Sequence, residues 1–464
     1  MNSLPPTFQA PLDPDFQPAI LWRRKFKEMV EASGDPATCR IALEQADGSI
    51  FHHETRLLPV SHPEVESNFR HVERLIKFLL WSRGGWRVHL SGPIGLAARL
   101  HSYFQDTATG RFDSNLIGEK VYGQAIEVLP TREIPAEQSA AQPMGRHLDG
   151  CRIGFDLGGS DRKVAAVIDG EVVFSEETVW DPYHKSDPQY HLDGILDSLQ
   201  RAAKHLPQVD AIGGSAAGVY VNNEVKVASL FRGIPDDLFD ARVRHIFREV
   251  GSTMGDLPIV VVNDGEVTAL AGSMSLGSNS VLGIAMGTSL ASGYVNRKGN
   301  ITTSLNELAF APVDYRADAP ADEWSGDLGC GVQYFSQQAV GRLLKPAKID
   351  LIEDLGLPEK LKEVQSLMEK EDPRASKIYE TLGVYLGYTL PHYADFYTME
   401  NVLLLGRVTS GTGGDLLLQK TNEVLKSEFP ELAEKLNFHI PDEKEKRHGQ
   451  AIAAASLPSI RHQA

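Results

Sequence analysis

The 464-residue sequence predicts an α/β protein in which two similar lobes follow a small N-terminal α/β unit. Two segments of equal length, residues 154–170 and 283–299, both have the order apolar strand, glycine-rich turn, second strand. Alternating helix and strand patterns follow each segment. Because this pattern occurs twice, we expect two α/β lobes, with a ligand in the crevice where they face each other.

The length agrees with about three compact units of about 150 residues each. The run 131–150, rich in Pro, Ala, Glu, Gln and Ser, reads as a linker. Before it, a helical pattern over 65–81 and a strand over 86–90 indicate a small α/β domain. The expected divisions are a flexible tail at 1–20, the small domain at 21–130, the linker at 131–150, a first lobe at 151–275 and a second lobe at 276–464.

The elements of the two lobes follow from periodicity. In the first lobe we expect strands over 153–157 and 164–168, then helix 189–205, strand 210–213, helix 236–250, strand 258–262 and helix 266–274. In the second we expect strands over 281–286 and 292–296, helices 334–344 and 374–397, strand 401–405, and helices 415–428 and 446–455.

Composition excludes several classes of protein. The net charge of −16 argues against a nucleic-acid partner, because phosphate backbones are bound by clustered Lys and Arg. No signal-peptide pattern and no membrane-length apolar run is found, so we expect a cytoplasmic protein without a membrane partner. The three cysteines, Cys39, Cys151 and Cys330, are too scattered for a disulfide framework or a Cys-x-x-Cys metal site, and buried thiols are expected.

The two glycine-rich turns suit a polyphosphate. A Rossmann or P-loop turn would lead into a helix, whereas here a strand follows at 163–168. Glycine lets backbone N–H groups approach an anion, and nearby hydroxyls add donors. One such turn is equally an ordinary hairpin, but a matched pair favours a clamp on one triphosphate. The first tip is Gly158, Gly159 and Ser160, and the second is Gly287, Thr288 and Ser289.

Asp156 is the one carboxylate in the apolar run 153–157, and it needs a partner there. A magnesium ion, held directly or through its water shell, would supply one and would neutralise charge on a transferring phosphoryl group. The alternative is a hydrogen-bonded structural aspartate.

Asn263 and Asp264 follow the buried strand 258–262 and begin the next helix. Ligands of open α/β sheets bind at the carboxyl ends of strands. Asn263 is suited to bind a hydroxyl and Asp264 to accept its proton, which points to chemistry on a polyol. The alternative is that Asp264 is only the helix N-cap.

Four ordered motifs over residues 151–460 resemble the ROK family of sugar kinases. They are Asp-Leu-Gly-Gly-Ser at 156–160, Asn263-Asp264 before a helix of small residues, Gly287-Thr288-Ser289 with Gly293, and Leu404-Leu405-Gly406. The resemblance implies the two-lobed actin-like ATPase (ribonuclease H-like) fold, ATP with Mg²⁺, a hexose or hexose derivative as acceptor, and a homodimer. The N-terminal unit is left unexplained.

The resemblance also implies roles for individual residues. Asp264 is then the catalytic base, and Asn263 and Glu307 contact the sugar. Asp161 would repel phosphate unless Lys163 or Arg162 compensates for its charge. The residues expected to bind ATP and Mg²⁺ are Asp156, Gly158, Gly159, Ser160, Lys163, Gly287, Thr288, Ser289, Gly406 and Arg407, with Asp156 holding the metal.

Two departures from the family concern sugar and zinc. The Glu-x-Gly-His of the family becomes Glu307-Leu308-Ala309-Phe310, which keeps the glutamate and loses the histidine. Its cysteine-rich segment falls on 323–332, where Cys330 remains and Val332 replaces a glutamate. Tetrahedral zinc needs four good donors, so no zinc is expected. With Phe310 and Val332 in the pocket, the acceptor would be a less polar, deoxy, amino-acylated or differently oriented sugar.

The function hypothesis is ATP-dependent phosphorylation of a sugar or sugar-derivative hydroxyl, with Asp264 as general base. One alternative is a non-catalytic sugar or nucleotide sensor of the same fold. Another is an ATPase that uses water as acceptor. A DNA-binding repressor is disfavoured, because residues 21–130 show strands and no basic helix-turn-helix pattern.

Overall fold

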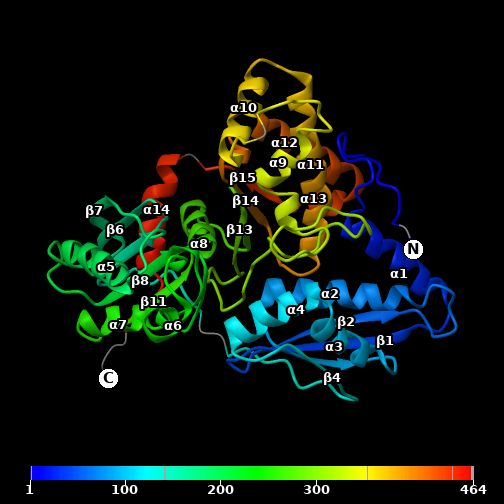
Figure 1. The fold of residues 1–464 in the computed structure, drawn as a ribbon, viewed down its shortest axis with the longest axis horizontal. Helices are drawn as coiled ribbons and strands as arrows, with labels where there is room; N and C mark the ends of the chain where they lie inside the picture. The colour runs from blue at the N-terminus through cyan, green and yellow to red at the C-terminus, as the bar shows by residue number, and fades with distance from the viewer. Residues whose placement is uncertain (2, 141–142, 353, 442, 461–464) are drawn as a thin grey trace.

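The structure is a computed structural model that describes residues 1, 3–140, 143–352, 354–441 and 443–460 (Figure 1). Within that part of the chain, no helix is both long and apolar enough to cross a bilayer. The N-terminal unit has its own sheet of order β2-β1-β3-β4, and helix α2 lies between this sheet and the second lobe. Its elements are α1 (Ala19–Ala32), β1 (Ala37–Glu44), β2 (Ile50–Leu57), α2 (Ser67–Arg83), β3 (Arg87–Ser91), α3 (Leu96–Asp106), α4 (Ala108–Asp113), the π-helix η1 (Ser114–Tyr122) and β4 (Glu127–Pro130).

The segment before α1 is packed, which corrects the expected flexible tail. Asp13 forms ion pairs with Arg316 at 2.8 Å and Arg342 at 3.1 Å, and it accepts a hydrogen bond from Tyr385 at 2.6 Å. Phe16 is buried beside Tyr385. Asp13 and Phe16 therefore attach this segment to the second lobe. Their partners lie about 300 or more residues away in the chain, so the local sequence does not reveal them.

The first lobe contains a five-stranded sheet of order β7-β6-β5-β8-β11. Strands β5, β6 and β7 are antiparallel neighbours, whereas β8 and β11 run parallel to β5. The carboxyl ends of β5, β8 and β11 therefore lie at one edge. The elements are β5 (Cys151–Leu157), β6 (Asp161–Ile168), β7 (Glu171–Val179), α5 (Pro188–Ala203), β8 (Ala211–Ala216), β9 (Val219–Val221), β10 (Glu224–Val227), η2 (Ser229–Phe231), α6 (Asp236–Leu238), η3 (Phe239–Val243), α7 (Ile246–Thr253), β11 (Ile259–Asn263) and α8 (Asp264–Leu276).

The second lobe repeats this arrangement with one strand fewer. Its sheet has the order β13-β12-β14-β15, with β12 and β13 antiparallel and β14 and β15 parallel to β12. The predicted duplication of a hairpin-led α/β lobe is confirmed. The elements are β12 (Val281–Met286), β13 (Leu290–Val295), η4 (Gly331–Gln333), α9 (Gln337–Leu343), α10 (Leu357–Glu369), α11 (Pro373–Ala394), β14 (Asn401–Leu405), η5 (Arg407–Thr409), α12 (Gly411–Glu428), α13 (Pro430–Ala433) and β15 (Asn437–His439).

The last helix, α14 (Glu443–Ala455), was expected in the second lobe but packs on the first sheet. Its backbone comes so close that a Cβ at Gly154 would lie 2.1 Å from the Ala451 carbonyl oxygen, and one at Gly213 would lie 1.7 Å from that of Ala454. The two glycines therefore let the helix sit directly on β5 and β8.

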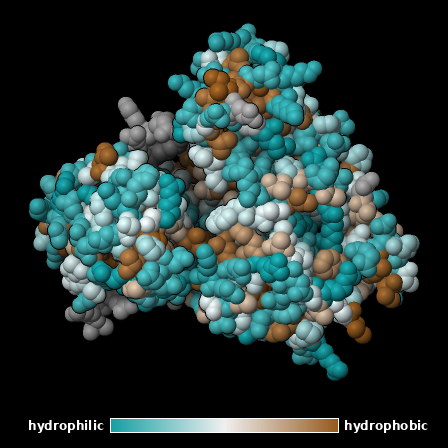
Figure 2. Space-filling view, viewed as in Figure 1, coloured by the Kyte–Doolittle hydropathy of each residue, from teal (hydrophilic) through white to brown (hydrophobic). Residues whose placement is uncertain are grey.

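The apolar cores show which parts form one body. One core runs from α1 and α2 into the second lobe and includes Trp22, Phe78 and Tyr385. The first lobe has a separate core around Phe155 and Ile195. The N-terminal unit is thus fused to the second lobe by shared burial, and Figure 2 shows the surface hollowed where the first lobe, on the left, meets the rest.

Candidate active site

Asp264 lies at the junction of β11 and α8. The side chain that caps α8 is Asn263, whose Oδ1 accepts from the Gly265 N–H at 2.7 Å while its Nδ2 donates to the Gly218 carbonyl at 2.8 Å. Asp264 Oδ1 is 3.0 Å from the same N–H. Because Asn263 already caps the helix, the Asp264 carboxylate is available for chemistry.

Asp264 lies within electrostatic reach of three other ionisable side chains. Burial raises the pKa of Asp264 to about 6, and the negative charge of Asp156 adds to this shift. Burial likewise raises the pKa of Glu307 to about 7, with a further contribution from Asp264. The pKa of Tyr220 is raised by burial and by the charge of Asp264. A perturbed acid with charged neighbours is typical of a functional site, and Asp264 is one, although it is not itself among the residues that line the cavity described below.

Asp156 is held by two neighbours. Its Oδ1 accepts from Ser215 Oγ at 2.8 Å, and its Oδ2 is 3.5 Å from Lys163 Nζ. The same ammonium is 2.9 Å from Asp161 Oδ1. Although burial lowers the pKa of Lys163, the hydrogen bond with Asp161 and the charge of Asp156 raise it overall. Lys163 therefore offsets both carboxylates, whereas Arg162 points to Asp197 at 2.6 Å.

The first tip is a tight turn closed by the Gly158 N–H, which donates to the Asp161 carbonyl at 2.9 Å. Trp180 stabilises this turn with two hydrogen bonds. Its Nε1 donates to the Gly158 carbonyl at 2.8 Å, and its backbone N–H donates to the Ser160 carbonyl at 3.1 Å. Ser160 Oγ donates to Asp161 Oδ2 at 2.8 Å. Gly159 lies against Tyr183, whose hydroxyl oxygen would be 2.1 Å from a Cβ there.

Strand β13, which follows the second tip, contacts the start of α8 through its backbone. A Cβ on Gly293 would be 2.3 Å from the Gly265 carbonyl oxygen, so α8 begins directly on β13. In the tip itself the Gly287 N–H donates to the Ser289 carbonyl at 3.0 Å, with Thr288 between them. Asp264 thus lies between the end of the first hairpin and the second hairpin.

Gly406 and Arg407 lie beside the second tip. A Cβ on Gly406, which has φ +92°, would be 2.4 Å from the carbonyl oxygen of Met286, the residue before the tip. Arg407 follows at an exposed position. Both are therefore placed at the outer side of the second glycine turn.

Glu307 is positioned by the N-terminal unit. The N–H groups of Leu305, Asn306 and Glu307 donate to the last-turn carbonyls of α2 at 3.2, 3.0 and 2.9 Å. These carbonyls have no partner within their own helix. Behind them, buried Glu266 accepts from Asn306 Nδ2 at 2.5 Å, and burial raises the pKa of Glu266 to about 8. Among the described residues, none donates a hydrogen bond to the Glu307 carboxylate.

A cavity of about 290 Å³ opens beside these residues, near the lower end of the roughly 300–1,000 Å³ of ligand pockets. Asn263, Glu266 and Glu307 line it, together with Tyr220 and residues of the N-terminal unit. Phe310 and Val332 do not, which corrects the expected pocket. Phe310 instead packs on Trp81, Phe112 and Trp324, with ring centroids 4.5, 5.8 and 5.4 Å away, and Val332 is buried.

The segment 323–332 is held by an ionic cluster with α2. Asp327 is 2.7 Å from Lys77 and 3.0 Å from Arg74, and Lys77 is also 2.8 Å from Asp113. Cys330 is buried, as predicted, and burial raises the pKa of its thiol. The described residues contain no group of three or more His, Cys, Asp or Glu side chains arranged to hold a metal.

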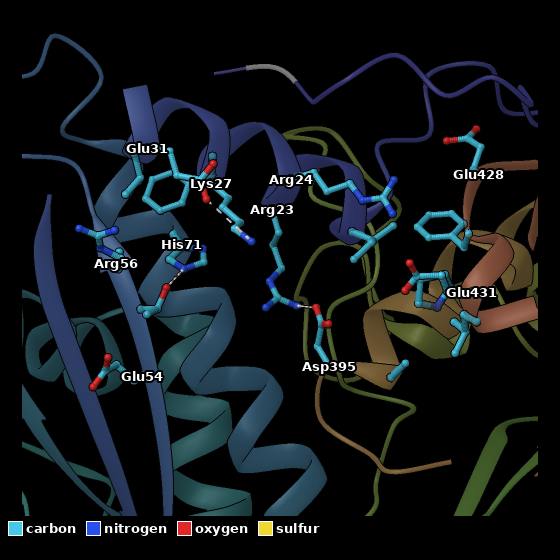
Figure 3. Close-up of a pocket in the computed structure, with 18 of the residues that line it drawn as sticks. Arg23, Arg24, Lys27, Glu31, Glu54, Arg56, His71, Asp395, Glu428 and Glu431 are labelled. Atoms are coloured by element: carbon cyan, nitrogen blue, oxygen red, sulfur yellow. Dashed lines mark hydrogen bonds and ion pairs between the residues drawn. The ribbon is translucent and has the colours of Figure 1, made fainter. Parts of the chain in front are cut away.

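A larger cavity, about 820 Å³, lies elsewhere, between α1, β2 and the helices of the second lobe (Figure 3). Its side chains of opposite charge pair with each other: Arg23 points to Asp395 at 2.8 Å, and Lys27 is 3.9 Å from Glu31. None of the predicted site residues lines this groove, so we assign the candidate site to the smaller cavity.

The sequence missed several residues of the site. Ser215 holds Asp156, but it lies past 213, where the strand was expected to end. Tyr220 stands on the short strand β9, which carries no strong pattern. The lining residues from the N-terminal unit have no local sequence pattern that marks them, because their place in the site depends on contacts between distant parts of the chain.

No family model matches the chain. A curated relative, the glucokinase of Halalkalibacterium halodurans, is 25% identical over 309 residues, covering 62% of this chain and 89% of the relative. Among solved structures, the ROK hexokinase from Thermus thermophilus aligns with a TM-score of 0.52 and 19% identity, covering 66% of this chain and 97% of that one. A ROK family transcriptional regulator, a homologue of the E. coli Mlc protein, aligns with a TM-score of 0.51 and 17% identity, covering 67% and 79%. The two-lobed actin-like fold of ROK proteins is confirmed.

Proposed function

We propose that this chain is a ROK-family sugar kinase that transfers the γ-phosphoryl group of ATP to a hydroxyl of a sugar or sugar derivative. The observation that carries the proposal is the position of Asp264. It is a carboxylate with a raised pKa that directly follows Asn263, a lining residue of the proposed acceptor cavity, and it lies close enough to Asp156 and Glu307 for the charges to interact. Phosphoryl transfer needs a base near the acceptor and groups that bind the phosphates.

Asp264 acts as the general base. A pKa of about 6 leaves its carboxylate mostly ionised at neutral pH, yet makes it a stronger base than an ordinary aspartate. As the acceptor hydroxyl attacks phosphorus, Asp264 takes its proton. Asn263 keeps one amide N–H beyond its capping bonds, and the Glu307 carboxylate has no hydrogen-bond donor among the residues that the structure describes, so both are suited to orient the acceptor.

The ATP side is built from the two glycine tips. Gly158, Gly159 and Ser160 approach the phosphates from the first lobe, and Gly287, Thr288 and Ser289 from the second. Lys163 supplies positive charge at the first tip, and Gly406 and Arg407 lie on the side proposed for adenosine.

Asp156 fits Mg²⁺, which is held by one or two carboxylates together with waters and phosphate oxygens. When bound, Mg²⁺ neutralises charge on the phosphates. Asp156 already accepts a hydrogen bond from Ser215 and lies near the Lys163 ammonium, and these contacts are compatible with a Mg²⁺ ion that Asp156 holds through a water molecule. We also propose a cytoplasmic location and a homodimer, and we propose neither zinc nor a nucleic-acid partner.

The proposal is tested by ADP release over a panel of hexoses, amino sugars and their acylated forms. Asp264→Ala is expected to lower kcat by about 10²–10⁴-fold, the usual contribution of such a base, while ATP binding stays nearly unchanged. A variant that phosphorylates at the wild-type rate would exclude Asp264 as the base. ADP release without added sugar would point instead to water as acceptor.

A second candidate is a non-catalytic sensor. The alignment with a ROK transcriptional regulator supports it, as does Phe310, which lies in an aromatic cluster outside the cavity. Binding of ATP or sugar without ADP release over the whole panel would favour this candidate.

A further inference from the structure

The N-terminal unit supplies one wall of the cavity that contains Asn263 and Glu307. Gln45, Ala46 and Asp47, from the turn between β1 and β2, line it. Tyr122, at the end of η1, lines it as well. These side chains lie more than 130 residues before the proposed base, so local sequence does not reveal their place in the site.

The turn is closed by its own hydrogen bonds and is hydrogen-bonded to the second lobe. The Gly48 N–H donates to the Gln45 carbonyl at 3.1 Å, and the Ser49 N–H donates to Asp47 Oδ1 at 2.8 Å. The other Asp47 oxygen accepts from Thr303 Oγ1 at 3.4 Å. Asp47, an exposed residue, is therefore held at the cavity by hydrogen bonds to both of its carboxylate oxygens.

Tyr122 enters the cavity wall through a gap left by a glycine. A Cβ on Gly84 would be 2.0 Å from the Tyr122 hydroxyl oxygen. The pKa of Tyr122 is raised by burial and by the charge of Asp47, which places the two side chains close together. Among the described residues, none forms a hydrogen bond with this hydroxyl, so it is available to a ligand.

The facing wall belongs to the first lobe. The β9–β10 hairpin carries Tyr220, and its turn residue Asn223 is pinned to the edge strand β11: Nδ2 donates to the Ile259 carbonyl at 2.7 Å and Oδ1 accepts from the Val261 N–H at 3.0 Å. A ligand in the cavity therefore touches the first lobe on one side and the N-terminal unit on the other.

The charge of the lining is one-sided. The ionisable side chains are Asp47, Glu266, Glu307 and two tyrosines, and the described lining residues include no Lys, Arg or His. At neutral pH Glu266 is mostly protonated, because burial raises its pKa to about 8, and Glu307, with a pKa of about 7, is ionised in part. A carboxylate or phosphate on the acceptor would still meet the negative charge of Asp47 and of ionised Glu307 without a cation to offset it, whereas an ammonium group would be attracted.

We infer that the N-terminal unit is a specificity element: Tyr122 and Asp47 contact the acceptor and restrict it to neutral or amino-bearing polyhydroxyl compounds, excluding acidic sugars. The inference rests on the proposed function, because it takes this cavity as the acceptor site. It gives the N-terminal unit a role in selecting the substrate and none in the transfer step itself.

The test compares glucose, glucosamine and glucuronate as probes, with both ADP release and equilibrium binding as readouts. Tyr122→Phe is expected to raise the acceptor KM about 3–10-fold, the loss of one hydrogen bond, with the KM for ATP within about twofold of wild type. Asp47→Lys should weaken the binding of glucosamine at least about tenfold and strengthen the binding of glucuronate. Asp35→Lys, an exposed position of the same unit, is the matched control and should change neither.

The outcomes separate this inference from the proposed function. If the wild-type protein binds a sugar but releases no ADP, the kinase proposal fails, and the binding data alone decide the inference. Weaker glucosamine binding by Asp47→Lys then supports it. A wild-type preference for glucuronate, variants that behave like Asp35→Lys, or no binding of any probe would overturn it.

Discussion

The backbone N–H of Glu307 donates to the carbonyl oxygen of Trp81 at 2.9 Å, so a proposed acceptor contact is held by the last turn of a helix from the N-terminal unit. At this point the second lobe and the N-terminal unit, an extension before the two lobes, are joined by backbone hydrogen bonds. Removing the extension would leave the backbone N–H groups of Leu305, Asn306 and Glu307 without their acceptors.

Glu307→Gln is expected to raise the acceptor KM about 3–30-fold, because a hydrogen bond is worth about 0.5–1.5 kcal/mol to a neutral group and about 1.5–3 kcal/mol to a charged one, and Glu307, with a pKa of about 7, is ionised in part. The KM for ATP should stay within about twofold. Steady-state kinetics with both substrates measure this, and Glu323→Gln, an exposed glutamate, is the control. An equal rise in both KM values would show a structural defect instead of a lost acceptor contact.

The pH dependence follows from the raised pKa of Asp264. The base must be ionised, and its pKa in the free protein is about 6, so the acceptor kcat/KM should fall as pH drops through about 6. An ordinary aspartate would place this limb near pH 3.9. A pH–rate profile between pH 5 and 8 measures it. A rate that stays flat down to pH 5 would contradict the burial of this carboxylate beside Asp156.

Lys77→Met should destabilise the fold by about 3–5 kcal/mol, because it leaves Asp113 buried without its cation and removes one of the two cations that pair with Asp327. Urea unfolding measures the loss, and Lys120→Met, at an exposed position, should be nearly neutral. Adding Asp113→Asn to Lys77→Met should recover part of the stability. No recovery would mean that the cation itself, and not the stranded carboxylates, sets the cost.

Gly293→Ala should lower the turnover rate strongly, while it lowers the stability of the fold only moderately. The new methyl group would lie 2.3 Å from the Gly265 carbonyl, so the start of α8, with Asp264, has to shift. Overpacking of this kind typically costs about 1–3 kcal/mol. Kinetics and thermal unfolding are measured together, with Gly449→Ala, where the nearest atom is 3.6 Å away, as control. Unchanged turnover would show that Asp264 tolerates such a shift.

Sequence patterns located the twin hairpins and most helices, because apolar β-branched runs ending in glycine and long amphipathic stretches are local signals. They missed β7, whose residues alternate between exposed and half-buried and include four glutamates or serines, leaving little apolar pattern. The helix expected over 236–250 is interrupted in the structure. There the Arg244 carbonyl accepts from the Val225 N–H at 3.0 Å, so a long-range pairing to β10 replaces a helical one.

The site was predicted in part for the same reason. Asp156, Asp264 and the glycine tips stand at strand ends, which a local pattern marks. Asn263 was expected to contact sugar, and its additional role as the cap of α8 depends on geometry. The contributions of Asp47 and Tyr122 arise only when the N-terminal unit docks on the second lobe, which no local pattern encodes.

The central claim is that Asp264 removes a proton from a sugar hydroxyl between two glycine turns. The most direct measurement follows ³¹P signals of ATP, ADP and sugar phosphate for the wild-type protein and Asp264→Asn, with ATP binding titrated for both. We predict a sugar phosphate formed one-to-one with ADP by the wild type, and a loss of about 10²–10⁴-fold in the variant at equal ATP affinity. Equal rates of sugar phosphate formation by the two proteins would contradict the claim.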